Sequence, residues 1–188
     1  MKKKLLTSEN VCLQIIDVQQ SLMSKIVNAD KIAATVELFV HCGRIFNIPM
    51  VANTQYKKGL GSYVPNIEPL VTDIPCFDKV EFNAVANSET EAFVDNLPES
   101  VTTMVLVGVE THICVYQTAM GLLQKGFAVW VVSDGVSSRS VEDHQNGIAR
   151  MLSEGVTVGS AEMLIYELLG KAGTPQFKQI LPYIIGRC

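Results

Sequence analysis

The chain has 188 residues and a formal net charge of −4, and 48% of its residues are hydrophobic. This length and composition predict one domain, residues 1–188, with a core large enough for a sheet that is buried on both faces. The acidic balance argues against nucleic acid as a partner, the one basic run being Lys2–Lys4, and no apolar stretch reaches the roughly 18 residues that a membrane span needs.

Strands and helices are expected to alternate along the chain. Apolar runs bounded by turn residues predict strands, and apolar residues three and four positions apart predict helices. The predicted strands are 11–17, 50–55, 102–109, 127–134 and 156–160, and the predicted helices are 30–46, 88–97, 114–125, 140–154, 161–169 and 174–185. Residues 56–75 hold several Gly and Pro and are expected to be loop with short turns, and residues 76–85 are expected to be irregular.

Two local signals indicate helix ends. Ser88 and Glu91 have the spacing of a capping box, which predicts that Ser88 begins the short helix there. Gly126 follows the helix predicted for residues 114–125 and is expected to close it.

The alternation of elements predicts an α/β fold. We expect a three-layer α-β-α sandwich with a central, mostly parallel, doubly wound (Rossmann-like) sheet of about six strands. Ligands of such sheets bind beyond the carboxyl ends of the strands. The polar residues that follow predicted strands are Asp17, Gln19, Thr54, Gln55, Glu110–Cys114 and Asp134–Arg139.

Cys114 lies where a predicted strand gives way to a helix. If Thr111 caps this helix, Cys114 is in the first turn, where unpaired N–H groups and the helix dipole favour a thiolate. A buried, inert cysteine is the alternative, and Cys12 and Cys42 fit it. The five cysteines are widely spaced, so we expect neither a disulfide framework nor a zinc site, and we predict a reducing, cytoplasmic location.

Three motifs stand in order along the chain. IIDVQ contains Asp17, FDKVEFNAV contains Lys79, and GVETHICV contains Cys114 and is followed by VVSDGVSSR. Together they resemble the isochorismatase-like superfamily of cysteine hydrolases, in particular its isochorismatase domain-containing branch. The resemblance covers nearly the whole chain and implies that residues 1–188 form a single isochorismatase-like hydrolase domain.

The resemblance implies a catalytic triad. Cys114 would be the nucleophile, Asp17 would take its proton, and Lys79 would orient Asp17 and help to stabilise the thiolate. It further implies a cis peptide bond between Val109 and Glu110, with the N–H groups of Glu110 and Cys114 as oxyanion donors. The implied reaction cleaves a small-molecule amide or related C–N bond through a covalent thioester.

One departure from the nicotinamidase pattern concerns metal. Nicotinamidases carry a metal-binding Asp-x-His after the second strand, whereas this chain has Asn-Thr-Gln at residues 53–55. His41, His112 and His144 are scattered and lack the spacing of metal ligands. We therefore expect a metal-independent enzyme without a cofactor, for which nicotinamide is a poor candidate substrate.

Candidates for the wall of a small-molecule pocket are Gln19, Gln55, Tyr56, Phe82, Glu110 and Thr111. For Glu110 and Thr111, a role in capping the helix is an equally open alternative. Asp134 and Arg139 are expected to pair, or to form hydrogen bonds that brace their turn. The hydrophobic content and the apolar segment ILPYIIG predict a homo-oligomer, a dimer or higher.

Two other functions remain open. The first is a catalytically weak binding or scaffold protein that keeps the fold and retains Cys114 as a redox-sensitive thiol. The second is a nucleotide- or flavin-binding domain, against which the missing GxGxxG and P-loop motifs argue.

Overall fold

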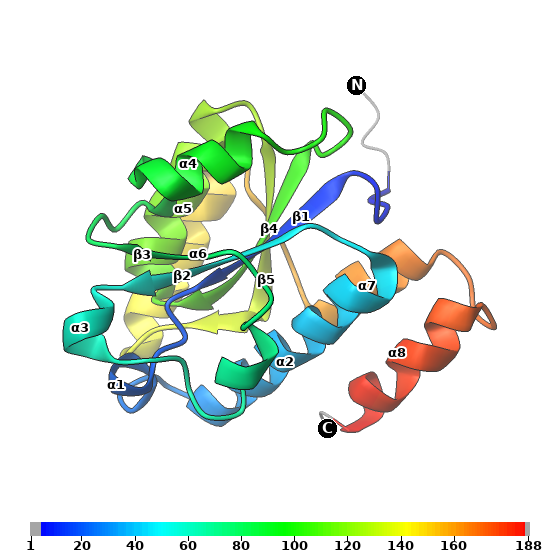
Figure 1. Ribbon diagram of the computed structural model, residues 1–188, viewed down its shortest axis with the longest axis horizontal. Helices are drawn as coiled ribbons and strands as arrows, with labels where there is room; N and C mark the ends of the chain where they lie inside the picture. The colour runs from blue at the N-terminus through cyan, green and yellow to red at the C-terminus, as the bar shows by residue number, and fades with distance from the viewer. Residues whose placement is uncertain (1–4, 187–188) are drawn as a thin grey trace.

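The computed structural model describes residues 5–186, and the basic run Lys2–Lys4 lies outside them. Within this range six strands form one sheet in the order β3-β2-β1-β4-β5-β6 (Figure 1). All five pairs of neighbouring strands are parallel. The strands are β1 (Val11–Ile16), β2 (Met50–Gln55), β3 (Cys76–Lys79), β4 (Thr103–Val109), β5 (Ala128–Ser137) and β6 (Thr157–Gly159).

Helices cover both faces of the sheet, which confirms the expected three-layer fold. The helices are α1 (Gln20–Met23), α2 (Ala29–Phe46), α3 (Lys57–Leu60), α4 (Ser88–Asp95), α5 (Tyr116–Gln124), α6 (Val141–Ser153), α7 (Ala161–Leu169) and α8 (Pro175–Gly186). Three further helical turns are η1 (Glu68–Leu70), η2 (Ala84–Ala86) and η3 (Thr111–Val115), of which the first two are 3-10 and the third is π-helical. Helices α2, α7 and α8 lie on one face, and α4, α5 and α6 lie on the other (Figure 1). No helix in the described range is both long and apolar enough to cross a membrane.

Two hydrophobic clusters form the core, one on each face of the sheet. Successive residues of β1 alternate between them: Leu13 and Ile15 belong to the cluster under α2, and Cys12 and Ile16 belong to the cluster under α5. All six residues of β1 are buried. A strand with both faces covered needs apolar residues at every position, which explains the continuous apolar run in the sequence.

Segment 76–85 was expected to be irregular, and this prediction is wrong for its first four residues. Cys76–Lys79 form β3, which pairs with β2 at the edge of the sheet. The strand is short and mostly exposed, with only Lys79 buried, so it lacks the apolar run that marks the other strands. The predicted cap of α4 is also wrong, because Asn87 and not Ser88 caps this helix by accepting a hydrogen bond from Thr90 N.

The strand order changes direction between β1 and β4, and this is where ligands bind in doubly wound sheets. Gly108, near the end of β4, pairs with Ile16, the last residue of β1. Gly108 has a φ of 120°, and a Cβ there would lie 2.0 Å from the carbonyl oxygen of Ile16. Only glycine permits this approach, so Gly108 allows β4 to deliver the next residues close to the end of β1.

Candidate active site

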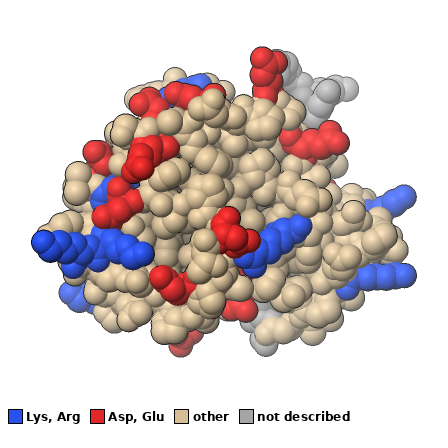
Figure 2. Space-filling view, viewed as in Figure 1, with Lys and Arg blue, Asp and Glu red and all other residues tan. Residues whose placement is uncertain are grey.

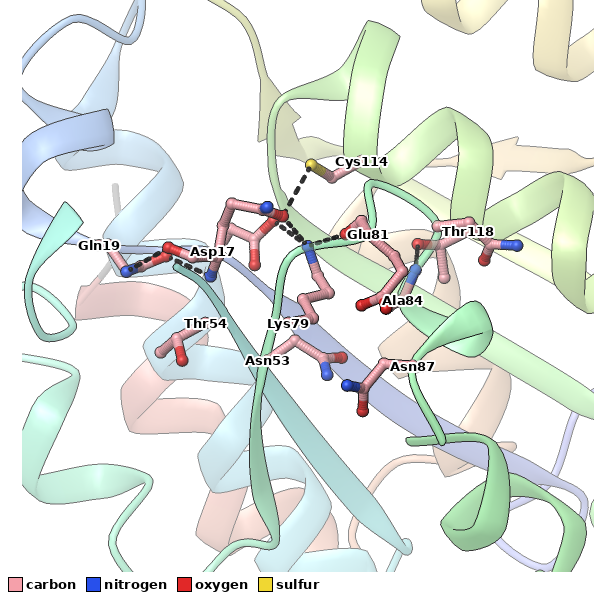
Figure 3. Close-up of polar contacts among 12 residues, drawn as sticks. Asp17, Gln19, Asn53, Thr54, Lys79, Glu81, Ala84, Asn87, Cys114 and Thr118 are labelled. Atoms are coloured by element: carbon pink, nitrogen blue, oxygen red, sulfur yellow. Dashed lines mark hydrogen bonds and ion pairs between the residues drawn. The ribbon is translucent and has the colours of Figure 1, made fainter. Parts of the chain in front are cut away.

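The three predicted catalytic residues come together at the carboxyl edge of the sheet. Asp17 follows β1, Lys79 is the last residue of β3, and Cys114 is in η3 directly after β4. Figure 3 shows the three side chains converging from these separate elements. All three are buried, with exposed fractions of 0% for Asp17, 1% for Lys79 and 7% for Cys114.

Lys79 forms a buried ion pair with Asp17. Its Nζ lies 2.8 Å from Asp17 Oδ2, and both side chains are fully shielded from solvent. The same Nζ donates to Gln55 Oε1 at 2.6 Å and to the carbonyl oxygen of Glu81 at 3.3 Å. These three acceptors match the three N–H donors of an ammonium group. Lys79 is therefore held as a cation whose donors are all occupied.

Asp17 adopts an unusual backbone conformation. Its φ of 55° lies in the left-handed region, which aspartate tolerates better than most residues. Burial raises the pKa of Asp17 above its ordinary value of 3.8, and the charge of Lys79 opposes this effect. Its Oδ1 has no hydrogen-bond partner within residues 5–186. The carboxyl group thus has one oxygen fixed by Lys79 and one oxygen able to accept a proton.

Cys114 does not have the acidic thiol that the sequence predicted. The helical turn η3 begins at Thr111 with Glu110 as its cap and has π-helical hydrogen bonding, with Val115 N donating to Glu110 O at 3.2 Å. Burial, and then the negative charge of Asp17, raise the pKa of Cys114 from 9.0 to about 12. Removal from water outweighs the helix terminus here, so the resting group is a thiol that needs a base.

Gln55 lies between the Asp17–Lys79 ion pair and the Cys114 thiol. Its Oε1 accepts from Lys79 and is 4.0 Å from Cys114 Sγ, while its Nε2 donates to Val80 O at 3.0 Å. Both ends of this amide are therefore engaged. Sequence reasoning placed Gln55 in the pocket wall and did not find its contact with Lys79, because that contact depends on the pairing of β2 with β3.

The side chain of Gln19 forms hydrogen bonds to the protein backbone. It is fully buried, its Oε1 accepts from Gln55 N at 2.7 Å, and its Nε2 donates to the carbonyl oxygens of Gln55 and Gly61. These bonds engage both ends of the Gln19 amide without a ligand. Gln19 thus holds the backbone of Gln55 in place. Of the other wall candidates, Tyr56 and Phe82 are 51% and 52% exposed.

The turn that carries Cys114 is braced from the side of β5 and α6. Glu110 Oε2 accepts from both the backbone N and Nε of Arg139, each at 3.0 Å. Thr111 Oγ1 lies 3.0 Å from His144 Nδ1, and His112 Nδ1 lies 2.9 Å from Ser138 Oγ. The peptide bond between Val109 and Glu110 is cis, as expected.

The roles expected for Asp134 and Arg139 are only partly correct. Arg139 does brace its turn, through Glu110, and the side chain of Glu110 is committed to this contact. Asp134 accepts from the backbone N of Ala161 at 2.7 Å and so ties β5 to the start of α7. The two histidines of the brace were not predicted as such, because their partners are distant in sequence.

Two further features bear on ligands. In the part of the chain that the structure describes, no group of three or more His, Cys, Asp or Glu side chains could hold a metal ion. A separate cavity of about 240 Å³ lies between α2, β5 and α6. His144 forms part of its lining, but Asp17, Lys79 and Cys114 do not.

Comparisons with known proteins identify the family to which this fold belongs. A family model described as the isochorismatase domain matches residues 11–163, a range that includes all three triad positions. The Secreted isochorismatase effector Isc1 of Phytophthora sojae is 33% identical over 171 residues, which cover 89% of this chain and 81% of the relative. Isochorismatase domain-containing protein 1 of Salmo salar is 37% identical over 164 residues, or 87% of this chain. The match covers 57% of that relative, so this chain spans little more than half of its length.

A solved structure shows the same likeness in three dimensions. The MAR1 ribonuclease of Caenorhabditis elegans superimposes with a TM-score of 0.89 and is 33% identical. The superposition covers 97% of this chain and 93% of that one.

Proposed function

The chain belongs to the isochorismatase family, and we propose that residues 1–188 form one hydrolase domain that cleaves a small-molecule amide or related C–N bond. The observation that supports this proposal is the buried Asp17–Lys79 ion pair beside the Cys114 thiol. A buried carboxylate with a raised pKa is suited to remove a proton from a thiol near neutral pH.

In the first step, Cys114 Sγ attacks the carbonyl carbon of the substrate while Asp17 takes the thiol proton. A C–S bond forms, and the electrons of the carbonyl π bond move onto its oxygen. The carbonyl then forms again as the C–N bond breaks, and Asp17 gives its proton to the departing nitrogen. The products of this half-reaction are an amine or ammonia and a thioester on Cys114.

In the second step, water attacks the thioester and gives a proton to Asp17. The C–S bond breaks, the carboxylic acid leaves, and the proton returns from Asp17 to the sulfur. Lys79 stays protonated throughout and keeps Asp17 oriented, because its three donors remain engaged. We further propose the N–H groups of Glu110 and Cys114 as the donors that stabilise the oxyanion.

We propose that this chemistry needs neither metal nor cofactor. At the end of β2, where metal ligands would be expected in a nicotinamidase, Asn53 is buried and bonds to Gln14 and Thr90. Thr54 Oγ1 donates to Asp78 Oδ1, and Gln55 is engaged by Lys79. These residues therefore serve the internal structure of the site.

We also propose a homo-oligomer that resides in the cytoplasm. Exposed apolar side chains gather on α7 and α8, namely Met163, Tyr166, Tyr183 and Ile185, which are 40–64% exposed. Such side chains are typical of surfaces that associate. Light scattering coupled to size-exclusion chromatography measures the number of subunits directly.

RNA is a second candidate substrate, because a relative with 33% identity is named as a ribonuclease. Against it, the net charge is −4, and basic groups on the face shown in Figure 2 are interspersed with acidic ones. A protein that binds nucleic acid usually presents a continuous basic surface. RNA therefore belongs in the assay as a test of this alternative.

The decisive experiment assays the wild type and Cys114→Ala on a panel of small amides, with RNA as a separate substrate. We expect Cys114→Ala to lower amide turnover by about a thousandfold or more. Cys76→Ala is the matched control, because Cys76 is exposed at the far end of β3, and it should keep full activity. Failure of the wild type on every amide would favour the binding or scaffold alternative.

A further inference from the structure

The polar side chains around Cys114 are already paired within the protein. Lys79 has an acceptor for each of its three donors, and both ends of the Gln55 amide are engaged. The carboxylate of Glu110 accepts two hydrogen bonds from Arg139. No cation in this group is both buried and free to receive a negative charge that a ligand brings next to the sulfur.

The electrostatic environment of the Cys114 sulfur also disfavours a negatively charged ligand. Burial is the largest influence on the Cys114 thiol, and the negative charge of Asp17 is the second. Glu110 adds to the effect of Asp17, and only Lys79 opposes them. An environment that disfavours a negative charge on the sulfur also disfavours a carboxylate directly beside it.

One buried acceptor remains open to a ligand. Asp17 Oδ1 is fully buried and accepts no hydrogen bond of standard geometry within the described residues, and the Cys114 thiol interacts with the same carboxylate. A neutral amide carries N–H donors that can satisfy this oxygen, whereas an ionised carboxylate has acceptors only. Asp17 Oδ1 is therefore suited to accept a hydrogen bond from the N–H of an amide substrate.

Apolar side chains lie on the segments that hold the site. Tyr56, Val80 and Phe82 are 51%, 69% and 52% exposed, and they follow the carboxyl ends of β2 and β3. Val80 O accepts from Gln55, and Tyr56 N donates to Lys79 O. We call these three side chains the apolar rim, and they offer contact area to an apolar group.

We propose that this site selects small neutral amides that carry an N–H and whose acyl group is apolar and bears no charge next to the carbonyl. This inference rests on the proposed function for the position of the substrate at Cys114. It narrows that function, because acids with a carboxylate beside the reacting carbon are excluded by the same surroundings.

The test compares two alkylating reagents of the same size, iodoacetamide and iodoacetate, on the intact protein. Cys76 provides an internal control, because it is an exposed residue in the same molecule and lies outside the proposed site. Peptide mass spectrometry gives the rate of labelling at each cysteine. We expect the preference for iodoacetamide over iodoacetate to be at least about tenfold greater at Cys114 than at Cys76. An equal preference at both cysteines, or no labelling of Cys114 by either reagent, would overturn the proposal.

A pair of variants tests the apolar rim. Phe82→Lys places a cation on the rim, and we expect the ratio of iodoacetate labelling to iodoacetamide labelling at Cys114 to rise at least about threefold. Leu152→Lys is the matched control, because Leu152 is 53% exposed near the far end of α6 and the net charge changes equally. If the two variants behave alike, the rim does not face the bound molecule, and this part of the proposal is wrong.

These measurements are independent of turnover, so two failures can be told apart. Selective labelling without amide hydrolysis would leave the selectivity of the site intact and refute the proposed function. Hydrolysis that depends on Cys114, combined with unselective labelling, would refute the selectivity and leave the proposed function intact.

Discussion

Two ion pairs lie near Cys114, the proposed nucleophile, and they differ in their exposure to water. In the Asp17–Lys79 pair both side chains are 0% exposed, whereas in the Glu110–Arg139 pair the arginine is 56% exposed and the glutamate 7%. The first pair contains the proposed base, and the second braces the turn that carries Cys114. The same type of contact therefore serves two different purposes in one site.

The difference in exposure indicates what each pair contributes. A buried charge is not solvated and depends on its partner for stabilisation. Removing the charge of either Asp17 or Lys79 should therefore destabilise the other. A solvated guanidinium gains little from an ion pair. However, Arg139 directs two N–H groups at one oxygen of Glu110, and this geometry joins the segment after β5 to the residue that caps η3. The outer pair should therefore act through its geometry more than through its charge.

The largest expected effect comes from breaking the buried pair on one side. Lys79→Met removes the cation and leaves Asp17 buried without a partner, so we expect a loss of about 3–5 kcal/mol in the free energy of unfolding. Urea unfolding at pH 7 measures it. The double variant Asp17→Asn/Lys79→Met is the control and should recover most of the loss, because no buried charge remains. If the free energy of unfolding of Lys79→Met fell by less than about 1 kcal/mol, the buried charge of Asp17 would not depend on Lys79, and the prediction would be wrong.

The same variant makes a prediction about pH. Burial raises the pKa of Asp17 above 3.8, and in Lys79→Met the opposing charge of Lys79 is gone. A carboxyl group with a raised pKa in the folded state favours folding at low pH, and this contribution is lost as the pH rises through the raised value. The stability gap between Lys79→Met and the wild type should therefore narrow as the pH is lowered from 7 toward 4. The gap between the wild type and the double variant should depend less on pH, since the double variant lacks Asp17.

An intermediate effect is expected at the outer pair. Glu110→Gln keeps an oxygen that can accept from Arg139, so we expect a change below about 1 kcal/mol in the free energy of unfolding. Glu110→Ala removes the acceptor and should lower the free energy of unfolding by about 1–3 kcal/mol. We also expect kcat/KM to fall further in Glu110→Ala than in Glu110→Gln. Urea unfolding and kcat/KM measured side by side separate the two variants. If Gln were as damaging as Ala, charge and not geometry would be the main contribution of Glu110.

Much of this arrangement could be predicted from the sequence. Asp17 and Cys114 follow strong apolar runs, and the alternation of strands and helices indicated that both would lie at one edge of a parallel sheet. The resemblance to a known family added Lys79. Lys79 was found although its own strand was missed, because β3 is a short edge strand without an apolar pattern.

The electrostatics of the site could not be predicted from the sequence. The position of Cys114 at the start of a helix suggested an acidic thiol, but burial raises its pKa to about 12. Burial results from packing between β1, β4 and α5, and sequence spacing does not report it. The contacts of Gln19 and Gln55 were missed for a similar reason, since they join residues at least 24 positions apart that the register of β1, β2 and β3 brings close together.

The smallest expected effect is at the third brace, the contact of Thr111 with His144. Thr111 is fully buried and its Oγ1 lies 3.0 Å from His144 Nδ1, so Thr111→Val removes one hydrogen bond at nearly constant volume. We expect a loss of about 1 kcal/mol in the free energy of unfolding. Thr111→Ser keeps the hydroxyl and is the matched control for kcat/KM, which should fall only a few-fold in Thr111→Val. Because Glu110 and His112 still hold the turn from the same side, a loss of activity as large as that of Glu110→Ala would show that the braces are not independent.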